Sequence, residues 1–331
     1  MTGETIGVLG GGAWGTALAQ TQAMRGRPVI LWARSPAIVA EIAGAHTNAG
    51  YLPGVALDPR LVATSDLTQA AARDIVLLVA PAQHARELAR QLRPLLKPTQ
   101  TAVICAKGIE QASGQLLNAV LAEELPGIPL AILSGPGFAA DVVRGLPAAL
   151  TLACRDENRG RAMAGRLSHP QFRLYWSADM TGVALGGSVK NVLGIAAGIL
   201  DGKCLGGSAH AALVSRGFAE LRRLGEALGA RPETLMGLSG LGDLILTCGS
   251  AQSRNMSLGR ALGQGATLAG VLGPRRAVTE GVYTAEAVKR LAALHGIDMP
   301  ICLAVAAILD GSISVDAAIN ALLQRPLKAE D

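Results

Sequence analysis

The sequence has little lysine, no closely spaced cysteine pair and no block of basic residues. Lysine accounts for only six of the 30 basic residues. The five cysteines are widely spaced and odd in number, so we interpret them as buried free thiols and expect no metal site. Because the positive charges are scattered, the formal net charge of +5 does not indicate a nucleic-acid-binding protein. It indicates at most a mild preference for anionic small molecules.

The sequence also lacks a recognisable secretion signal and the pattern of a membrane-spanning helix. The chain begins Met1-Thr2-Gly3-Glu4 and has neither a basic leader nor a signal-type apolar stretch before its first strand, which predicts a cytoplasmic protein. One long apolar run lies between Asp179 and Asp201. It is rich in glycine, contains a Lys-Asn pair and lacks an aromatic belt. We therefore expect a buried core helix and no membrane span.

The first half of the chain alternates between apolar strand patterns and helical stretches. Strands are predicted over residues 6–10, 28–33, 74–80, 101–106, 130–133, 148–154 and 172–176, and helices over 14–25, 84–96 and 115–124. Continuous apolar strands between helices are typical of a parallel sheet covered on both faces. We therefore expect an α/β fold whose residues 1–178 form a dinucleotide-binding domain with a Rossmann-type, doubly wound sheet.

After Ser177 the pattern contains helices and no strand. The predicted helices cover residues 181–200, 209–228, 241–248, 256–262, 283–295, 300–309 and 315–323. A chain of 331 residues is long enough for two domains. Residues 179–331 are accordingly expected to form an all-helical domain that binds the substrate and carries the catalytic residue.

A glycine-rich turn follows the first predicted strand. Gly10, Gly12 and Gly15 fit the pattern G-x-G-x-x-G and open a helix. In this position the glycines permit a tight turn, close approach of the backbone to a pyrophosphate, and packing of the helix on the strand. The helix N-terminus then faces the phosphates. A purely structural turn is the alternative interpretation.

The end of the second predicted strand lacks the carboxylate that an NAD site usually carries. Trp32-Ala33-Arg34-Ser35 stands there instead. Arg34 could accept a 2′-phosphate, which favours NADP(H), with NAD(H) still possible. Arg34 could also be an ordinary surface arginine.

Lys190 is the single charged residue in the apolar run, and we regard it as the candidate chemical centre. A buried ammonium costs several kcal/mol unless it is paired or loses its proton. Gly186, Gly194 and Gly198 share its helix face, where they permit close approach of another backbone or of a nicotinamide ring. The alternative is a structural lysine that reaches a carboxylate.

Three further groups of polar residues could complete a site. Lys107 ends a predicted strand and the loop Ser134–Ala139 ends the next one, at the sheet edge where ligands bind, although this loop could be a plain turn. Asp243 lies in an apolar, glycine-rich segment and needs a partner, for which Lys190 is the obvious candidate. Ser253-Arg254-Asn255 suits a phosphate or carboxylate, or is a solvated loop.

In combination these motifs resemble those of the bacterial NAD(P)-dependent glycerol-3-phosphate dehydrogenase family. The resemblance covers almost the whole chain and rests on G-G-G-A-W-G at 10–15, N-A-G-Y-L-P-G at 48–54, A-K-G-I-E at 106–110, S-G-P-G-F-A at 134–139, G-G-S-V-K-N-V at 186–192, G-L-G-D-L-I-L-T-C at 240–248, Q-S-R-N at 252–255 and V-T-E-G at 278–281. It implies reversible, NAD(P)H-dependent reduction of dihydroxyacetone phosphate to sn-glycerol 3-phosphate for phospholipid synthesis.

The resemblance also implies residue roles. Lys190 would donate and accept the proton. The substrate would contact Lys107, Gly135, Gly137, Lys190, Asp243, Ser253, Arg254 and Asn255, and the cofactor would contact Ala13, Trp14, Arg34, Tyr51, Lys107, Ala139, Arg254, Val278 and Glu280. The chain departs from the family pattern at Ala13 and Gly137, which lack a hydroxyl found in many members, and across residues 202–210.

Two other functions fit parts of the same pattern. A β-hydroxyacid dehydrogenase also joins a nucleotide domain to a helical domain that carries a lysine, but it acts on a carboxylate substrate, whereas the Ser253–Asn255 cluster favours a phosphate. A catalytically silent NADP-binding regulator would be favoured only if Lys190 or Asp243 were missing. A homodimer through the helical domain is a further hypothesis.

Overall fold

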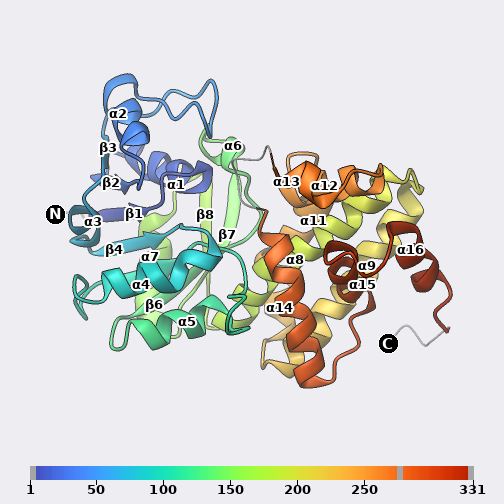
Figure 1. The fold of residues 1–331 in the computed structure, drawn as a ribbon. Helices are drawn as coiled ribbons and strands as arrows, with labels where there is room; N and C mark the ends of the chain where they lie inside the picture. Colours follow the sequence, from blue (N-terminus) through green and yellow to red (C-terminus); the bar gives the residue numbers. More distant parts are fainter. Residues whose placement is uncertain (1–4, 274–278, 327–331) are drawn as a thin grey trace.

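The computed structural model describes residues 5–273 and 279–326, which form a sheet-containing half and a helical half (Figure 1). The last strand ends at Ser177 and the next helix begins at Met180. The change of secondary structure therefore occurs where the sequence pattern changes.

One eight-stranded sheet forms the first half, in the order β3-β2-β1-β4-β5-β6-β7-β8. The strands are β1 Ile6–Leu9, β2 Val29–Trp32, β3 Leu61–Thr64, β4 Ile75–Leu78, β5 Thr101–Ile104, β6 Leu130–Ser134, β7 Ala148–Ala153 and β8 Phe172–Ser177. All neighbouring strands are parallel except β6 and β7, which are antiparallel. The strand order reverses between β1 and β4, where doubly wound sheets bind ligands. The predicted fold class is confirmed.

Helices cover both faces of this sheet. They are α1 Ala13–Ala23, α2 Pro36–Ala45, α3 Leu67–Ala71, the 3₁₀ turn η1 Ala82–His84, α4 Ala85–Leu92, α5 Leu117–Glu124, α6 Ala139–Val142 and α7 Glu157–Leu167. Successive strand residues point to opposite faces. Val8 and Leu77 therefore join a core with α1 and α7, whereas Leu9 and Leu78 join a second core with α4 and α5.

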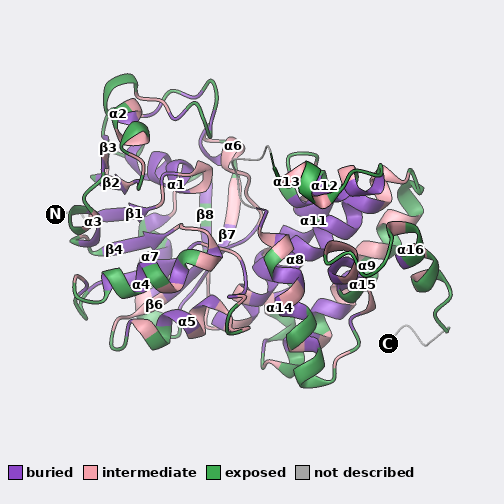
Figure 2. Cartoon of the chain, viewed as in Figure 1, coloured by how far each residue is buried: buried purple, intermediate pink, exposed green. Residues whose placement is uncertain are grey.

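The second half is built around one long helix. Its elements are α8 Met180–Gly202, α9 Gly206–Ala227, α10 Pro232–Met236, the π-turn η2 Leu238–Gly242, α11 Asp243–Cys248, α12 Arg254–Gly263, α13 Leu268–Leu272, α14 Glu280–His295, α15 Pro300–Leu309 and α16 Val315–Leu323. Helix α8 packs against α9, α11, α12 and α14 and is buried along most of its length (Figure 2). Its first turn, Met180 and Val183, belongs to a core of the sheet half, so α8 joins the two halves.

Helix α8 is the one described helix long and apolar enough to span a membrane. However, 89% of its most apolar stretch is buried inside the protein. The core helix of a folded domain has the same length and composition, and α8 occupies that position.

Candidate active site

The ammonium group of Lys190 is held by two residues of α11. Lys190 Nζ donates to Asp243 Oδ1 at 2.6 Å and to Thr247 Oγ1 at 2.9 Å. Lys190 is 8% exposed and Asp243 is 1% exposed. The pairing of Asp243 with Lys190 that the sequence indicated is therefore present. Thr247 was not predicted, although it lies one turn after Asp243 on the same helix face, a spacing that could have identified it.

Lys107 shares the same carboxylate. Its Nζ donates to Asp243 Oδ2 at 2.6 Å and to the Gly135 carbonyl oxygen at 2.8 Å. Two ammonium groups thus flank one carboxylate, and the cluster is positive overall. An ammonium has three N–H donors, so each lysine has one left after its two bonds within the described residues. The cluster can bind an oxygen that carries negative charge.

Burial and neighbouring charges adjust the proton affinity of Lys190. Burial lowers the pKa of Lys190 from 10.5 to about 8, Asp243 opposes this effect, and the charge of Lys107 adds to the lowering. A group with a pKa near the ambient pH can both donate and accept a proton. Lys190 is therefore suited to acid–base chemistry.

Close backbone packing brings Asp243 to Lys190. A Cβ atom on Gly186 of α8 would lie 2.6 Å from the Ser239 carbonyl oxygen, and one on Gly240 would lie 1.9 Å from that of Leu235. Only glycine allows these approaches. The π-turn η2 lies directly before Asp243, and such turns are frequent at functional sites. The small-residue face of α8 therefore packs against protein backbone, which was one of its two predicted uses.

In the cluster Ser253–Asn255, the side chains of Ser253 and Asn255 form hydrogen bonds within the protein. Ser253 Oγ accepts from Met256 N at 3.2 Å and caps α12. Asn255 Nδ2 donates to Asn191 Oδ1 at 2.9 Å, and Asn255 Oδ1 accepts from Gly281 N at 3.1 Å. Asn255 thus ties α12 to α8 and α14, Ser253 caps α12, and Arg254 between them is exposed.

The glycine turn has the shape that a dinucleotide requires. Gly10 has φ +137°, and a Cβ on Gly15 would lie 1.9 Å from the Gly10 carbonyl oxygen, so both positions require glycine. Gly12 faces open space at the N-terminus of α1, where backbone N–H groups attract phosphate. These residues therefore fit a bound pyrophosphate.

Trp14 lies between the glycine turn and the loop after β6. A Cβ on Gly137 would meet the Trp14 ring at 3.4 Å, so the two segments are in contact. Ala13 and Ala139 are the first residues of α1 and α6. These positions thus come together beside the glycine turn.

The remaining predicted cofactor residues lie on three segments. Arg34 follows β2 and is exposed, and Tyr51 is 38% exposed in the loop between α2 and β3. Glu280 begins α14. Its Oε1 accepts from Ala82 N at 3.0 Å, while its buried Oε2 has no partner within the described part of the chain. Burial raises the pKa of Glu280. Val278 lies outside the described residues.

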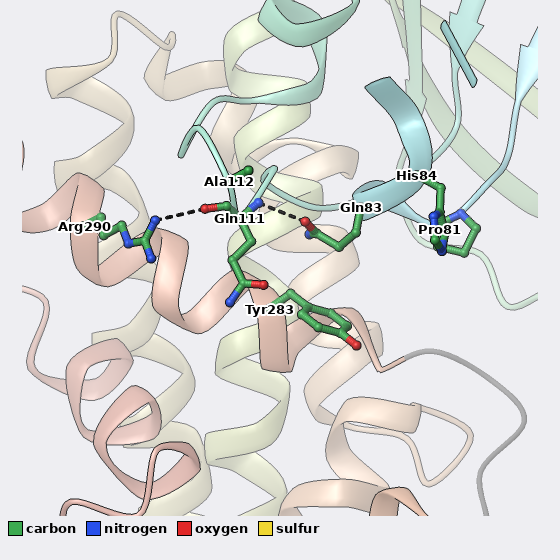
Figure 3. A pocket seen from close by; sticks show the side chains of 7 residues that line it. All are labelled: Pro81, Gln83, His84, Gln111, Ala112, Tyr283 and Arg290. Atoms are coloured by element: carbon green, nitrogen blue, oxygen red, sulfur yellow. Dashed lines mark hydrogen bonds between the residues drawn. The ribbon is translucent and has the colours of Figure 1, made fainter. Parts of the chain in front are cut away.

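An open pocket of about 560 Å³ lies beside the contact between Ala82 and Glu280. It is lined by Pro81, Gln83, His84, Gln111, Ala112, Tyr283 and Arg290 (Figure 3). Gln111 N donates to Gln83 Oε1 at 2.9 Å, and Arg290 Nη1 donates to the Gln111 carbonyl oxygen at 3.0 Å. The bond from Arg290 ties α14 to the sheet half. No described group of three His, Cys, Asp or Glu side chains could hold a metal ion.

Family models match both halves of the chain. Residues 5–160 match the N-terminal model of NAD-dependent glycerol-3-phosphate dehydrogenase, and residues 179–320 match the C-terminal model. The family resemblance seen in the motifs is confirmed.

Individual relatives give the same result. The chain is 56% identical over 330 residues to the glycerol-3-phosphate dehydrogenase [NAD(P)+] of Caulobacter vibrioides, with both chains covered completely. It is 56% identical to the protein of that name from Parvibaculum lavamentivorans, with 98% of each covered. A crystal structure of the Coxiella burnetii glycerol-3-phosphate dehydrogenase superposes with a TM-score of 0.93 at 38% identity, covering 98% of this chain and 99% of that one.

Proposed function

Because the chain belongs to the NAD-dependent glycerol-3-phosphate dehydrogenase family, we propose that it is a glycerol-3-phosphate dehydrogenase that uses NAD(P)(H). It interconverts dihydroxyacetone phosphate and sn-glycerol 3-phosphate for phospholipid synthesis. The observation that carries this assignment is the Lys107–Asp243–Lys190 cluster, with its spare N–H donors and a lysine whose pKa is about 8. The relatives support this function and not that of a β-hydroxyacid dehydrogenase.

The residues divide the chemistry between them. The bound reduced cofactor supplies the hydride. Lys190 Nζ stabilises the negative charge that develops on the carbonyl oxygen and gives it a proton, while Asp243 and Thr247 hold the ammonium in place. In the opposite direction neutral Lys190 removes the hydroxyl proton. Arg254, exposed at the start of α12, binds the phosphate with its guanidinium group.

The other predicted contacts belong to the same proposal. Lys107, Gly135, Gly137, Ser253 and Asn255 surround the substrate, and the glycine turn, Trp14, Ala139 and Glu280 surround the cofactor. We assign residues 1–178 to the cofactor-binding domain and 179–331 to the substrate-binding domain. We also propose a cytoplasmic location and a homodimer through the helical domain.

The test is oxidation of NADPH and of NADH by the full chain with dihydroxyacetone phosphate, compared with small keto acids. We expect turnover with dihydroxyacetone phosphate, and Lys190→Met should lower it roughly 10²–10⁴-fold while the cofactor still binds. Turnover only with keto acids would reject the substrate, and near-normal turnover of the variant would reject the role of Lys190.

Arg34 determines the cofactor preference in this proposal. An exposed arginine after β2 offers a fork of donors to a 2′-phosphate. Activity should therefore be higher with NADPH, and Arg34→Ala should raise the KM for NADPH without raising that for NADH. A clear preference of the parent protein for NADH would refute this assignment.

A further inference from the structure

Asn48 lies in a long irregular segment between α2 and β3 and contacts the glycine turn. Its side chain is buried, with the residue 1% exposed. Asn48 Nδ2 donates to the Gly11 carbonyl oxygen at 3.0 Å and to Thr16 Oγ1 at 2.8 Å. Both hydrogens of the amide group are thus directed to the segment that opens α1.

The contact with Gly11 fixes the direction of a neighbouring donor. The Gly11 carbonyl and the Gly12 N–H belong to one trans peptide group, so they point in opposite directions. Asn48 holds the carbonyl toward the buried side. The Gly12 N–H consequently points the other way, and Gly12 itself borders open space, since a Cβ added to it would meet nothing within 4 Å. That open side is where a pyrophosphate would lie.

Asn48 also orders the segment that carries Tyr51. The Asn48 carbonyl oxygen accepts from Tyr51 N at 3.1 Å and from Leu52 N at 2.8 Å, and Leu52 is buried in the core beneath. A single residue therefore connects the glycine turn to the second predicted cofactor segment. The sequence motif at 48–54 showed no reason for its asparagine, and this connection supplies one.

We propose that Asn48 is a positioning residue of the cofactor site. Its side chain sets the Gly11–Gly12 peptide so that its N–H faces the pyrophosphate, and it joins the Tyr51 segment to the glycine turn. The inference rests on the proposed function, because it takes NAD(P)(H) as the ligand of the glycine turn. Asn48 itself touches neither substrate nor reacting atoms.

The experiment measures cofactor binding and kinetics of the full-length Asn48→Ala variant. The dissociation constant of NADPH, followed by its fluorescence, and the KM for NADPH should rise about tenfold, the loss expected from one buried hydrogen bond. The KM for dihydroxyacetone phosphate and kcat should stay within about twofold of the parent values. A merely structural residue would not separate these constants.

Two sets of variants serve as controls. Thr16→Val removes one acceptor of the Asn48 amide and should weaken NADPH binding, whereas Thr16→Ser retains the hydroxyl and should restore it. Glu41→Ala releases the same loop on both sides of Asn48 but removes neither bond of the Asn48 amide, because Glu41 Oε1 accepts from Ala49 N and Thr47 Oγ1. It should leave NADPH binding within about twofold of the parent value.

The outcomes separate the inference from the proposed function. Unchanged NADPH binding by Asn48→Ala overturns the inference, as does equal weakening by Glu41→Ala. A parent protein that binds NADPH but does not reduce dihydroxyacetone phosphate contradicts the proposed function, while the binding measurements still decide the role of Asn48.

Discussion

At the scale of single residues, the site depends on Asp243. Its two oxygens each hold one ammonium, and the residue is almost completely buried. Loss of this carboxylate would leave the buried Lys190 and the partly buried Lys107 without a counter-charge, which is strongly unfavourable. Asp243 therefore aligns the reactive amine and balances the charge that Lys107 brings near it.

The charge of Lys107 gives a prediction about pH. In the proposed mechanism the oxidation of glycerol 3-phosphate needs neutral Lys190, so kcat should rise with pH through the Lys190 pKa of about 8. Because Lys107 lowers that pKa, Lys107→Met should raise it and move the rise in kcat to higher pH. The measurement is kcat against pH for the parent, for Lys107→Met and for Lys97→Met, whose lysine is exposed and lies on another loop.

Lys97→Met should reproduce the parent profile. A Lys107→Met profile that is unchanged, or displaced to lower pH, would show that Lys107 does not act on Lys190 through its charge.

At the scale of secondary-structure elements, glycines determine how closely α8 and α12 pack. A Cβ on Gly198 would lie 2.1 Å from the Met256 carbonyl oxygen, and one on Gly259 would lie 2.0 Å from that of Ile195. The two helices thus contact each other through their backbones. This contact places Asn255 against Asn191 beside Lys190.

Substitution within this contact should therefore destabilise the protein. Gly198→Ala should lower the free energy of unfolding by about 1–3 kcal/mol, because backbone atoms cannot move aside as a side chain can. Gly165→Ala is the matched control. It lies in helix α7 with nothing within 4 Å of the added Cβ, and it should stabilise by about 0.5–1 kcal/mol. Urea denaturation measures both, and equal effects would exclude close helix packing as the cause.

Sequence patterns predicted long apolar elements better than short or exposed ones. The bounds predicted for α15 and α16 agree with the structure, since a proline or serine marks each start. Strand β3 was not predicted, because it is a short edge strand with an exposed Val62. Helix α7 was also missed, since its arginines and glycines obscure its apolar face. The antiparallel pairing of β7 depends on tertiary packing, so strand periodicity could not show it.

The candidate site was predictable only in part for the same reason. A charge inside an apolar run identified Lys190 and Asp243 without a structure. The sharing of Asp243 by Lys107, and the contact of Thr247 with Lys190, join residues far apart in the sequence. Helical spacing after Asp243 could have pointed to Thr247, but no local pattern specifies that Lys107 shares the same carboxylate.

At the scale of the whole molecule, α14 ties the helical half to the sheet half. Glu280 accepts from Ala82 N. Arg290 donates to the Gln111 carbonyl oxygen (Figure 3). The Glu280 carboxylate is buried at this junction without a cationic hydrogen-bond partner among the described residues. Its burial raises its pKa above the ordinary value of 4.5.

This raised pKa makes stability depend on pH. As pH rises above 4.5 the unfolded chain loses this proton before the folded protein does, which costs stability, and the cost disappears as pH falls back toward 4.5. Glu280→Gln removes this titration. The unfolding free energy of Glu280→Gln minus that of the parent should therefore increase with rising pH between 4.5 and 8.

Urea unfolding of the cofactor-free protein at several pH values gives this difference. Glu233→Gln, a change at an exposed glutamate in α10, should give a difference that is nearly constant with pH. A constant or decreasing difference for Glu280→Gln would be inconsistent with a buried, ionised carboxylate at the junction.

The shared carboxylate also has a consequence for biosynthesis. Translation produces the strands, the glycine turn and Lys107 well before it produces Asp243. Domains generally form as units in the order in which they leave the ribosome. Under the proposed function, we therefore expect the sheet half of a nascent chain to fold before the amine of Lys190 has its carboxylate partner, so that reduction starts only after Asp243 has been translated.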